Sequence, residues 1–474
     1  MKELEKLYQR IVQRTNINLR ELNIDVNPYI HDLIPLSKLL KFYAFYGITP
    51  NHPLDLQLVH SSLSGSYFLG KCRVRNSLLY KSDIRGDELK KKGDAFQYNG
   101  QPIPITDDEG IDIEDSFLIK TLVHNYSHDP ETLEKFYIRD TISLNYANIH
   151  GSPSSGCFLG PFSTVDLTTL RDCIIGTFSY IQAGEISHQN IGPGTVWVKN
   201  GDVFNFLYRY PLDRLSGYIS FSAGNPPRGR LIDFLEERKE AFQPVFDKVN
   251  HKPPVPVPAS ASLDRYAVTD TQTHIGENVL VSQRAFLQNA WLGKGANAQE
   301  NCFIINSRLE GYNVTAHGAK IIEADMGRNG FVGFNSFLRG RPDVRLTIGK
   351  ECIVMPHTII DVVEDLAVPD GHVVWGMITN RKERDMNSLP ISEFKKIKAG
   401  FSKGNMFFEG SGNAFITAFK DRIHHILEAN GAFFNDAGEN RGHAQKNQNI
   451  SFNTIQPYPE GDKLGLYPTI MIQP

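Results

Sequence analysis

The sequence predicts a mainly β protein in which most of the chain coils into a three-sided prism of short parallel strands. Aliphatic residues recur at every sixth position in several stretches, as at Ile275, Val281 and Leu287. A glycine often follows the aliphatic residue directly, as it does after Val332 and Ile348. A period of six fits neither a helix nor an ordinary strand. It fits a short strand with one inward side chain and a tight corner, three of which complete a coil.

Length and composition are compatible with a large ordered core. The chain has 474 residues, of which 41% are hydrophobic and 22% charged, and its formal net charge is −3. This balance predicts roughly two to four structural units and gives no reason to expect nucleic acid or a membrane as a partner. Five widely spaced cysteines without a CxxC pair predict free thiols in a reducing compartment. Without a signal-like apolar segment at the N-terminus, the expected location is the cytoplasm.

The repeat signal divides the chain into two blocks. In the second block the phases are clear, and Ile275, Val281, Leu287, Ile348, Val354 and Ile360 are predicted to point inward. In the first block the phase is weaker and insertions interrupt it. Between the blocks, the apolar stripe of residues 231–249 predicts a helix kinked at Pro244. The expected segments are an N-terminal helical segment (1–55), the first block (56–215), a helix with a Pro-rich linker (216–262), the second block (263–382), and a C-terminal helix with an irregular tail (383–474).

The end of the second block resembles the closing coil of the hexapeptide-repeat, left-handed β-helix superfamily. Residues 368–371 (VPDG) and 373–376 (VVWG) match the exit motif of that superfamily, whereas residues 377–380 depart from its Pro-Ala-Lys. The resemblance covers roughly residues 60–215 and 265–382. It implies a left-handed parallel β-helix and, as oligomer, a homotrimer. It also implies one of three functions, namely an acyltransferase, a gamma-class carbonic anhydrase-like metal enzyme, or a non-catalytic scaffold.

The acyltransferase is the preferred interpretation, with an acyl-CoA thioester as donor and a small-molecule hydroxyl or amine as acceptor. Such a transfer needs a general base, and members of the superfamily use a histidine on a coil. We expect His188 to be this base, because Glu185 is close enough in sequence to orient its ring. His317, beside a glycine in the second block, is the next candidate.

Other residues are candidates for binding the two substrates. Gly376 lies in the exit motif, and the basic residues Arg381 and Lys382 that follow it are candidates for contacting the phosphates of acyl-CoA. In the first block, Arg85 held by Asp83 is a candidate for binding a substrate carboxylate.

A zinc site is the alternative to the acyltransferase. His124 and His128 lie four positions apart, and His150 follows at a distance of about one coil. Three histidines are the ligand set with which zinc lowers the pKa of a bound water. The spacing of the close pair differs from that of the gamma-class carbonic anhydrases, so the resemblance does not by itself establish this site.

Overall fold

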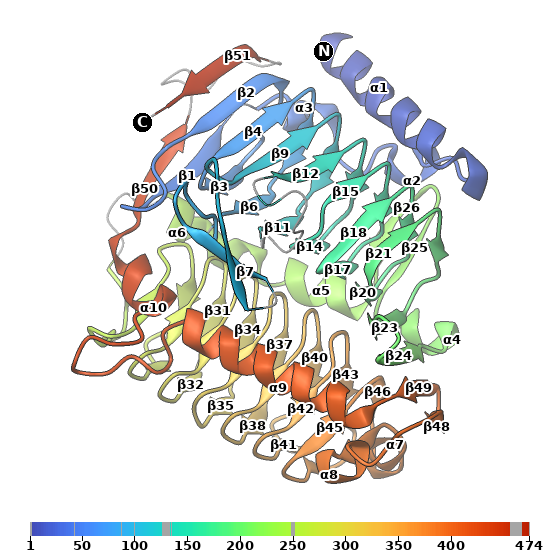
Figure 1. The fold of residues 1–474 in the computed structure, drawn as a ribbon, viewed down its shortest axis with the longest axis vertical. Coiled ribbons are helices and arrows are strands. Elements are labelled where there is room, and N and C mark those ends of the chain that lie inside the picture. The colour runs from blue at the N-terminus through green and yellow to red at the C-terminus, as the bar shows by residue number, and fades with distance from the viewer. Residues whose placement is uncertain are drawn as a thin grey trace. The chain divides into compact units, whose positions relative to one another are not determined.

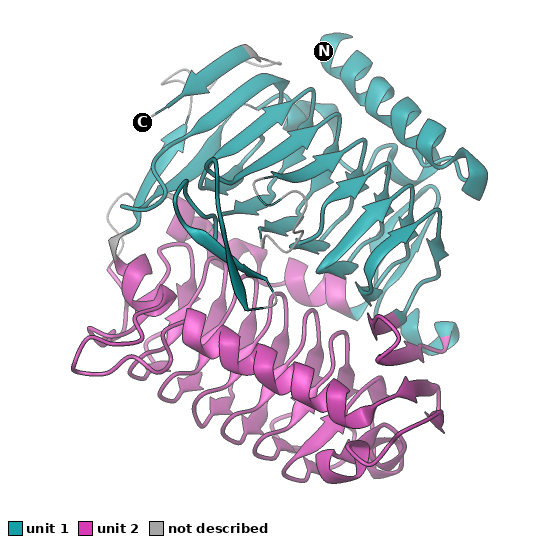
Figure 2. Ribbon diagram, viewed as in Figure 1, with its two compact units in different colours: residues 1–195, 212–230, 450–474 teal, residues 196–211, 231–449 magenta. Residues whose placement is uncertain are grey.

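Short strands make up most of the chain, and helices lie at its N-terminus and along its second half (Figure 1). The computed structural model describes residues 2–41, 43–86, 88–98, 100–125, 133, 135–247, 252–455 and 467–473. The chain forms two units (Figure 2). Unit 1 contains Met1–Thr195, Leu212–Arg230 and Ile450–Pro474, and unit 2 contains Val196–Pro211 and Leu231–Asn449.

Unit 2 is a stack of three-sided coils. Strands generally pair in parallel with the third strand further along the chain, so three successive strands complete a coil. One side contains β27 (Ser262–Leu263), β30 (Leu280–Val281), β33 (Asn297–Ala298), β36 (Val314–Thr315), β39 (Phe331–Val332), β42 (Ile353–Val354) and β45 (His372–Val374). The second side contains β28 (Val268–Thr269), β31 (Phe286–Gln288), β34 (Phe303–Ile305), β37 (Lys320–Ile322), β40 (Phe337–Arg339), β43 (Ile359–Asp361) and β46 (Met377–Ile378). The third side contains β29 (His274–Ile275), β32 (Trp291–Leu292), β35 (Arg308–Leu309), β38 (Ala324–Met326), β41 (Leu346–Ile348) and β44 (Leu366–Val368).

The core of unit 2 is the interior of this prism. Most of the short strands send one aliphatic side chain inward, and the register places these side chains above one another, as for Ile304, Ile321 and Leu338. The residues that the sixfold phase predicts to point inward are all buried in this one core, which confirms that prediction: Ile275, Val281, Leu287, Ile348, Val354 and Ile360.

Unit 1 has the same three-sided arrangement with less regular coils. One side contains β1 (Ala44–Ile48), β3 (Ser66–Leu69), β6 (Asp83–Arg85), β11 (Leu122–His124), β14 (Asn148–His150), β17 (Thr164–Asp166) and β20 (Tyr180–Gln182). The second contains β5 (Leu78–Tyr80), β10 (Phe117–Ile119), β13 (Ile142–Ser143), β16 (Phe158–Leu159), β19 (Ile174–Ile175) and β22 (Asn190–Ile191). The third contains β2 (Leu56–Ser61), β4 (Cys72–Arg75), β9 (Gly110–Glu114), β12 (Lys135–Arg139), β15 (Ser154–Ser155), β18 (Thr168–Arg171) and β21 (Gly184–Ser187). A hairpin of β7 (Ala95–Tyr98) and β8 (Gln101–Pro104) lies in an insertion between β6 and β9.

Helices and edge strands cover the apolar outer surface of unit 1. Helix α1 (Lys2–Asn18) packs Leu4, Leu7 and Ile11 in one cluster with Phe117 and Ile142 of the second side. Short helices α2 (Asn27–Ile30) and α3 (Leu36–Leu39) follow, and strand β1 then lies within the range expected to be helical. Strands β50 (Ser451–Ile455) and β51 (Tyr467–Ile472) pair antiparallel with β1 and β2. These two strands cover edges that would otherwise be open to pairing with another chain.

The outer surface of unit 2 is covered in the same way. The single helix kinked at Pro244 that was expected at 231–249 is wrong, because the segment breaks into α5 (Arg230–Glu236), a 3-10 turn and α6 (Gln243–Asp247). The proline at the second position of α6 lacks the N–H that a continuous helix would need there. The ring centroid of Phe234 lies 5.2 Å from that of Phe303 and 5.9 Å from that of Phe337, so α5 packs on the second side. Helix α9 (Gly412–Ala429), close to the expected 413–428, packs Phe419 against Phe331.

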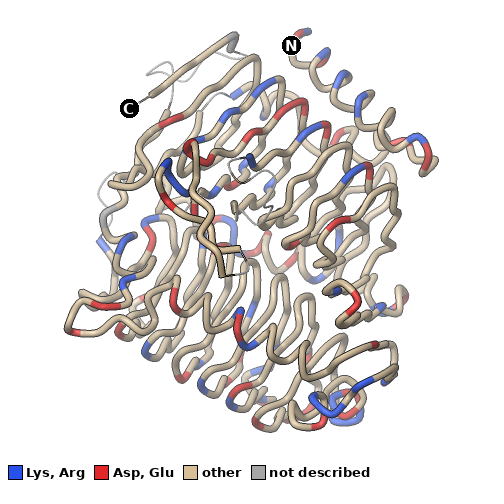
Figure 3. Tube along the Cα trace, in the orientation of Figure 1, with Lys and Arg blue, Asp and Glu red and all other residues tan. Residues whose placement is uncertain are grey.

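Charges of both signs are interspersed along both units (Figure 3). All five cysteines are buried free thiols, as the sequence predicts: Cys72, Cys157, Cys173, Cys302 and Cys352. Within the described ranges, no helix combines the length and the apolar character needed to cross a membrane.

Candidate functional site

A row of ionisable side chains follows the first-named side of unit 1. Arg85, His124, His150 and Asp166 occupy the same register on the successive strands β6, β11, β14 and β17. Each directly follows a buried aliphatic residue, so by the alternation of a strand it points away from the core. Neighbouring strands lie about 4.8 Å apart, so adjacent members of the row are within reach of one another. We call these four residues the polar column.

Within the polar column, His150 is held by a carboxylate. Its Nδ1 lies 2.7 Å from an oxygen of Asp166, and the Asp166 side chain is fully buried. The hydroxyl of Tyr180 also donates a hydrogen bond to Asp166, and it lies 3.0 Å from Oε1 of Gln182. A buried carboxylate at Nδ1 favours the tautomer with the proton on that nitrogen and fixes the orientation of the ring.

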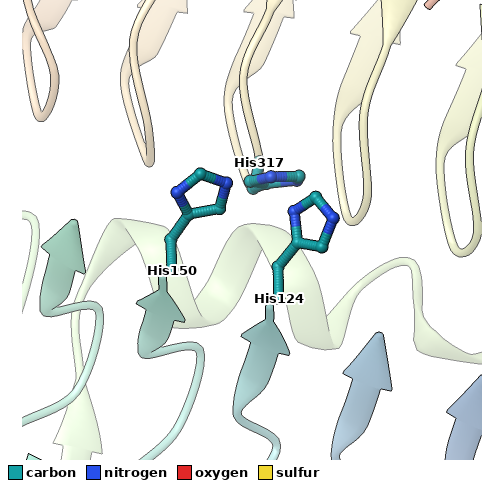
Figure 4. A group of neighbouring side chains, drawn as sticks. All are labelled: His124, His150 and His317. Carbon is teal, nitrogen blue, oxygen red and sulfur yellow. The ribbon is translucent and has the colours of Figure 1, made fainter. Parts of the chain in front are cut away.

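His124 lies beside His150 in the polar column. The two ring centroids are 5.0 Å apart, the ring planes are inclined by 61°, and the nitrogens that could bind a metal lie within 4.8 Å. Figure 4 shows the two rings side by side, projecting from neighbouring parallel strands. His128, the remaining histidine of the predicted zinc set, lies outside the described residues.

Unit 2 contains a second histidine–carboxylate pair. Nδ1 of His317 lies 2.7 Å from a carboxylate oxygen of Glu300, and the two side chains are only 3% and 7% exposed. The ring of Phe334 lies 5.2 Å from the His317 ring, measured between centroids. Glu300, His317 and Phe334 stand at equivalent corners of successive coils, because Gly318 N donates to Glu300 O and Asn335 N to His317 O. Figure 4 also draws His317.

The corner that carries His317 is held firmly. Gly318 has a φ of +72°, and a Cβ at this position would lie 2.4 Å from Oδ1 of Asn335, so both conformation and space favour glycine. The ammonium of Lys320 donates to the Gly318 carbonyl. The Cys302 thiol lies 3.1 Å from the carbonyl oxygen of Ala316. Burial lowers the pKa of Lys320 to about 8 and raises that of Cys302 to about 12.

His188, the base preferred from the sequence, has a different setting. It lies at a coil corner with a φ of +51°, and 53% of its side chain is exposed. Its Nδ1 is 3.8 Å from a carboxylate oxygen of Asp172 and 3.9 Å from one of Glu21. The expectation that Glu185 orients His188 is wrong, since Glu185 contacts Arg171 at 3.7 Å instead. Residues three apart on this strand and corner do not share a face, which is why the sequence spacing misled.

The residues predicted to bind acyl-CoA lie around the last coil of unit 2. Gly376 has a φ of +73°, and a Cβ there would lie 2.4 Å from the Tyr208 ring. Its carbonyl accepts a hydrogen bond of 3.0 Å from Tyr210. Arg381 begins helix α7 (Arg381–Met386), where its guanidinium donates to the Asp365 carbonyl at 3.3 Å. Lys382 is exposed.

The predicted substrate residues Asp83 and Arg85 are both 2% exposed and flank Ile84 on β6. The Arg85 guanidinium lies 5.7 Å from the centroid of the Tyr67 ring. The structure brings Arg85 into one row with His124 and His150, which the sequence did not predict.

Comparison with known proteins places the chain in a family. A crystal structure of a candidate acetyltransferase from Desulfovibrio desulfuricans G20 is similar, with 51% identity and a TM-score of 0.93 over 100% of this chain and 99% of that one. A family model described as a hexapeptide repeat including loop matches residues 101–223. The chain belongs to the hexapeptide-repeat transferases.

Two further matches to the hexapeptide-repeat chain are much weaker. A hexapeptide transferase family protein from Anaplasma phagocytophilum matches with 12% identity and a TM-score of 0.22, over 34% of this chain and 90% of that one. A UDP-N-acetylglucosamine acyltransferase from Campylobacter jejuni matches with 10% identity and a TM-score of 0.15, over 63% and 93%. A search of curated proteins returns no match.

Sequence reasoning missed the two carboxylates that hold the histidines of this hexapeptide-repeat chain. Asp166 lies 16 residues after His150, which is one coil of unit 1. Glu300 lies one coil of unit 2 before His317, since coil neighbours there are 17 residues apart, as Asn289 and Asn306 are. Searching for acids one coil away from each histidine would have found both, whereas the search for acids close in sequence found Glu185.

Proposed function

We propose that the protein is an acyltransferase in which His317 is the general base. The donor would be an acyl-CoA thioester, and the acceptor a hydroxyl or amino group of a small molecule. Two observations support this proposal. The relative at 51% identity over the whole chain is described as a candidate acetyltransferase. The observation that carries the role of His317 is its 2.7 Å contact with the nearly buried Glu300.

The proposed reaction uses the pair as follows. With Nδ1 facing Glu300, Nε2 of His317 is the nitrogen that accepts the proton of the acceptor as its oxygen or nitrogen attacks the thioester carbonyl. Glu300 stabilises the imidazolium that forms. When the tetrahedral intermediate collapses, the carbon–sulfur bond breaks, and the imidazolium returns the proton to the departing thiolate. The low exposure of the pair would limit hydrolysis of the thioester by water.

His188 is the competing base, and its geometry supports it less well. Its nearest carboxylates are 3.8 and 3.9 Å away, beyond hydrogen-bond distance, and half of its ring is exposed. A base whose tautomer is not fixed spends part of its time with the wrong nitrogen facing the acceptor. We therefore place His317 first and use His188 as the matched comparison.

The residues for the two substrates follow the same proposal. Gly376, Arg381 and Lys382 would contact acyl-CoA, with Lys382 the exposed cation available to a phosphate. Arg85 with Asp83 would bind a carboxylate of the acceptor through a charge-assisted hydrogen bond.

The resemblance to the wider superfamily adds two expectations to the proposal, namely left-handed coils and assembly as a homotrimer. The free cysteines and the N-terminal sequence add a third, that the protein acts in the cytoplasm. Light scattering at micromolar concentration tests the trimer, and a stable monomer would exclude it.

The deciding experiment follows thiol release from acetyl-CoA and longer acyl-CoAs with a panel of hydroxyl and amino acceptors. A thermal-shift screen first selects the donor, since a bound ligand raises the melting temperature. His317→Gln should lower kcat by about two to four orders of magnitude, the usual effect of losing a general base. Glu300→Gln should lower it less, because the imidazole remains.

His188→Gln is the matched control and should keep kcat within about twofold of the parent. The opposite ranking, with His188→Gln inactive and His317→Gln active, would move the base to His188. Absence of thiol release with every donor and acceptor would remove the acyltransferase proposal itself.

A further inference from the structure

We propose that the polar column of unit 1 binds a divalent metal ion of the zinc class, with His124 and His150 as ligands. Acyl transfer by a histidine base requires no metal, so this site goes beyond the proposed function. The proposal depends on the two imidazoles and their neighbours in unit 1 and not on the identity of any acyl donor.

The spacing of the two imidazoles suits a single ion. Zinc–nitrogen bonds are about 2.0–2.1 Å, so two nitrogens on one tetrahedral ion lie roughly 3.3 Å apart. The candidate ligand nitrogens of His124 and His150 are within 4.8 Å, and the rings do not stack but are inclined by 61°. A modest rotation of the side chains is enough to bring both nitrogens onto one ion.

The hydrogen bonds around His150 are those of a metal ligand. Metal-binding histidines usually give their other ring nitrogen to a carboxylate, which fixes the ring and increases its basicity. Nδ1 of His150 is 2.7 Å from Asp166, so Nε2 is the nitrogen that would bind the ion. Tyr180 in turn donates to Asp166 and holds the carboxylate in place.

The charges of the site also have to balance. Arg85 is the neighbour of His124 in the polar column, and its positive charge disfavours binding of a second cation there. Two buried carboxylates on the same side of the unit, Asp83 and Asp166, offset that charge. Imidazole ligands favour zinc, copper, nickel and iron over calcium and magnesium, which prefer oxygen.

Two histidines do not complete the coordination of zinc, which commonly has three protein ligands when a water takes the fourth position. The remaining positions would be taken by water or by a further side chain, and the Co²⁺ spectrum in the test below reports the resulting ligand geometry.

The experiment measures metal content and a metal-specific spectrum, without an acyl donor. The full chain is stripped with a chelator, reloaded with Zn²⁺ or Co²⁺, and desalted. Metal is then counted by mass spectrometry, and the visible d–d bands of Co²⁺ report the ligand geometry. We expect stoichiometric binding to the parent and its loss in His124→Gln and His150→Gln. Asp166→Asn should weaken affinity by about 10–100-fold.

His188→Gln, an exposed histidine of the same unit, is the control and should bind like the parent. Far-ultraviolet circular dichroism confirms that each variant is folded. If a histidine variant does not fold, the metal affinity of Asp166→Asn tests the proposal in its place. Undiminished metal content and unchanged Co²⁺ bands in both histidine variants would overturn the proposal, as would failure of the parent to retain either metal.

The His317→Gln variant separates this proposal from the preceding one. We expect retained metal with lost thiol release, which would support both proposals at once. Loss of metal in this variant would contradict a site formed by unit 1 alone. Because metal is measured without substrate, an inactive protein that still binds Zn²⁺ leaves the metal site standing.

Discussion

The two units have the same three-sided fold, but the length of their coils is more regular in unit 2 than in unit 1. In unit 2 the residues that pair on neighbouring coils are 17 or 18 positions apart along most of the stack, and 20 or 22 apart in two of its later coils. In unit 1 the interval is 16 residues for the later coils but 39 across the insertion that contains β7 and β8. Both units nevertheless stack aliphatic residues at most inward positions, such as Ile149 on Val165 and Ile304 on Ile321. The fold depends on strand register, and the corners tolerate insertions.

The units differ more in their outward positions. On the second side of unit 2, Phe303, Lys320 and Phe337 share one register, and Phe234 packs over the two phenylalanines. On the first-named side of unit 1, the outward positions of the polar column hold ionisable groups instead. Burying an ionisable group lowers stability unless the group is paired. We therefore expect the ionisable residues at these outward positions to be present for a chemical function and not for stability.

The largest expected effect on stability comes from truncating the two inward stacks. Ile321→Ala in unit 2 and Ile149→Ala in unit 1 should each lower the free energy of unfolding by about 2–5 kcal/mol. Both side chains are fully buried, so the two losses should be similar. Urea denaturation measures the loss, and hydrogen exchange shows which unit opens. If Ile149→Ala costs much less than Ile321→Ala, the irregular coils of unit 1 repack around cavities, and the equivalence of the two cores fails.

A smaller effect should come from the buried ammonium of Lys320. Burial lowers its folded pKa to about 8, below the ordinary 10.5. Between these values the unfolded chain holds a proton that the folded chain has released, so this group makes stability rise with pH across that window. Lys320→Met should remove a rise on the order of 1–3 kcal/mol between about pH 7 and about pH 10.

The measurement is urea denaturation of both proteins across this pH range. Lys382→Met, which removes an exposed cation of the same unit, is the control and should parallel the parent. If the Lys320→Met and parent curves are also parallel, the side chain keeps its ordinary pKa, and the contrast between outward positions of the two units is weaker than drawn here.

The smallest effect should come from the cap of α9, the long helix of unit 2. Ser411 accepts a hydrogen bond of 3.2 Å from the Ala414 N–H. Ser411→Ala leaves that donor without its cap and should cost about 0.5–2 kcal/mol, whereas Ser411→Asp should cost little. Thermal denaturation of the two variants checks the difference. A loss as large as that of Ile321→Ala would mean that α9 contributes to the core and does not merely cover it.

The sequence was most informative where one side chain per strand determines the fold. The sixfold phase from Ile275 to Leu287 identified inward positions correctly, because only an inward aliphatic residue satisfies every coil. It was less informative at 231–249, where an apolar stripe predicted one helix but α5 ends at Glu236 and Pro244 lies in the separate helix α6. The apolar stripe indicates which residues of the segment are buried, but it does not indicate into how many helices the segment divides.

The candidate sites were harder to predict for a related physical reason. His317 and His150 were candidates from the sequence, but their partners Glu300 and Asp166 are neighbours only through stacking of coils. Two residues that interact between neighbouring coils are separated in the sequence by the length of one coil. That length varies wherever a corner carries an insertion. The roles of His188, His317, Arg85 and the acyl-CoA residues remain for the experiments described above.

Strands β50 and β51 of unit 1 are synthesised last, long after the strands with which they pair. They pair with β1 and β2, yet the whole of unit 2 is translated between those partners. While the ribosome is still making unit 2, the edges of β1 and β2 must wait uncovered, and a nascent chain with open edges is exposed to wrong pairing. The rate of translation through residues 231–449 therefore sets how long these two edges stay uncovered, so slow synthesis is expected to favour aggregation through them.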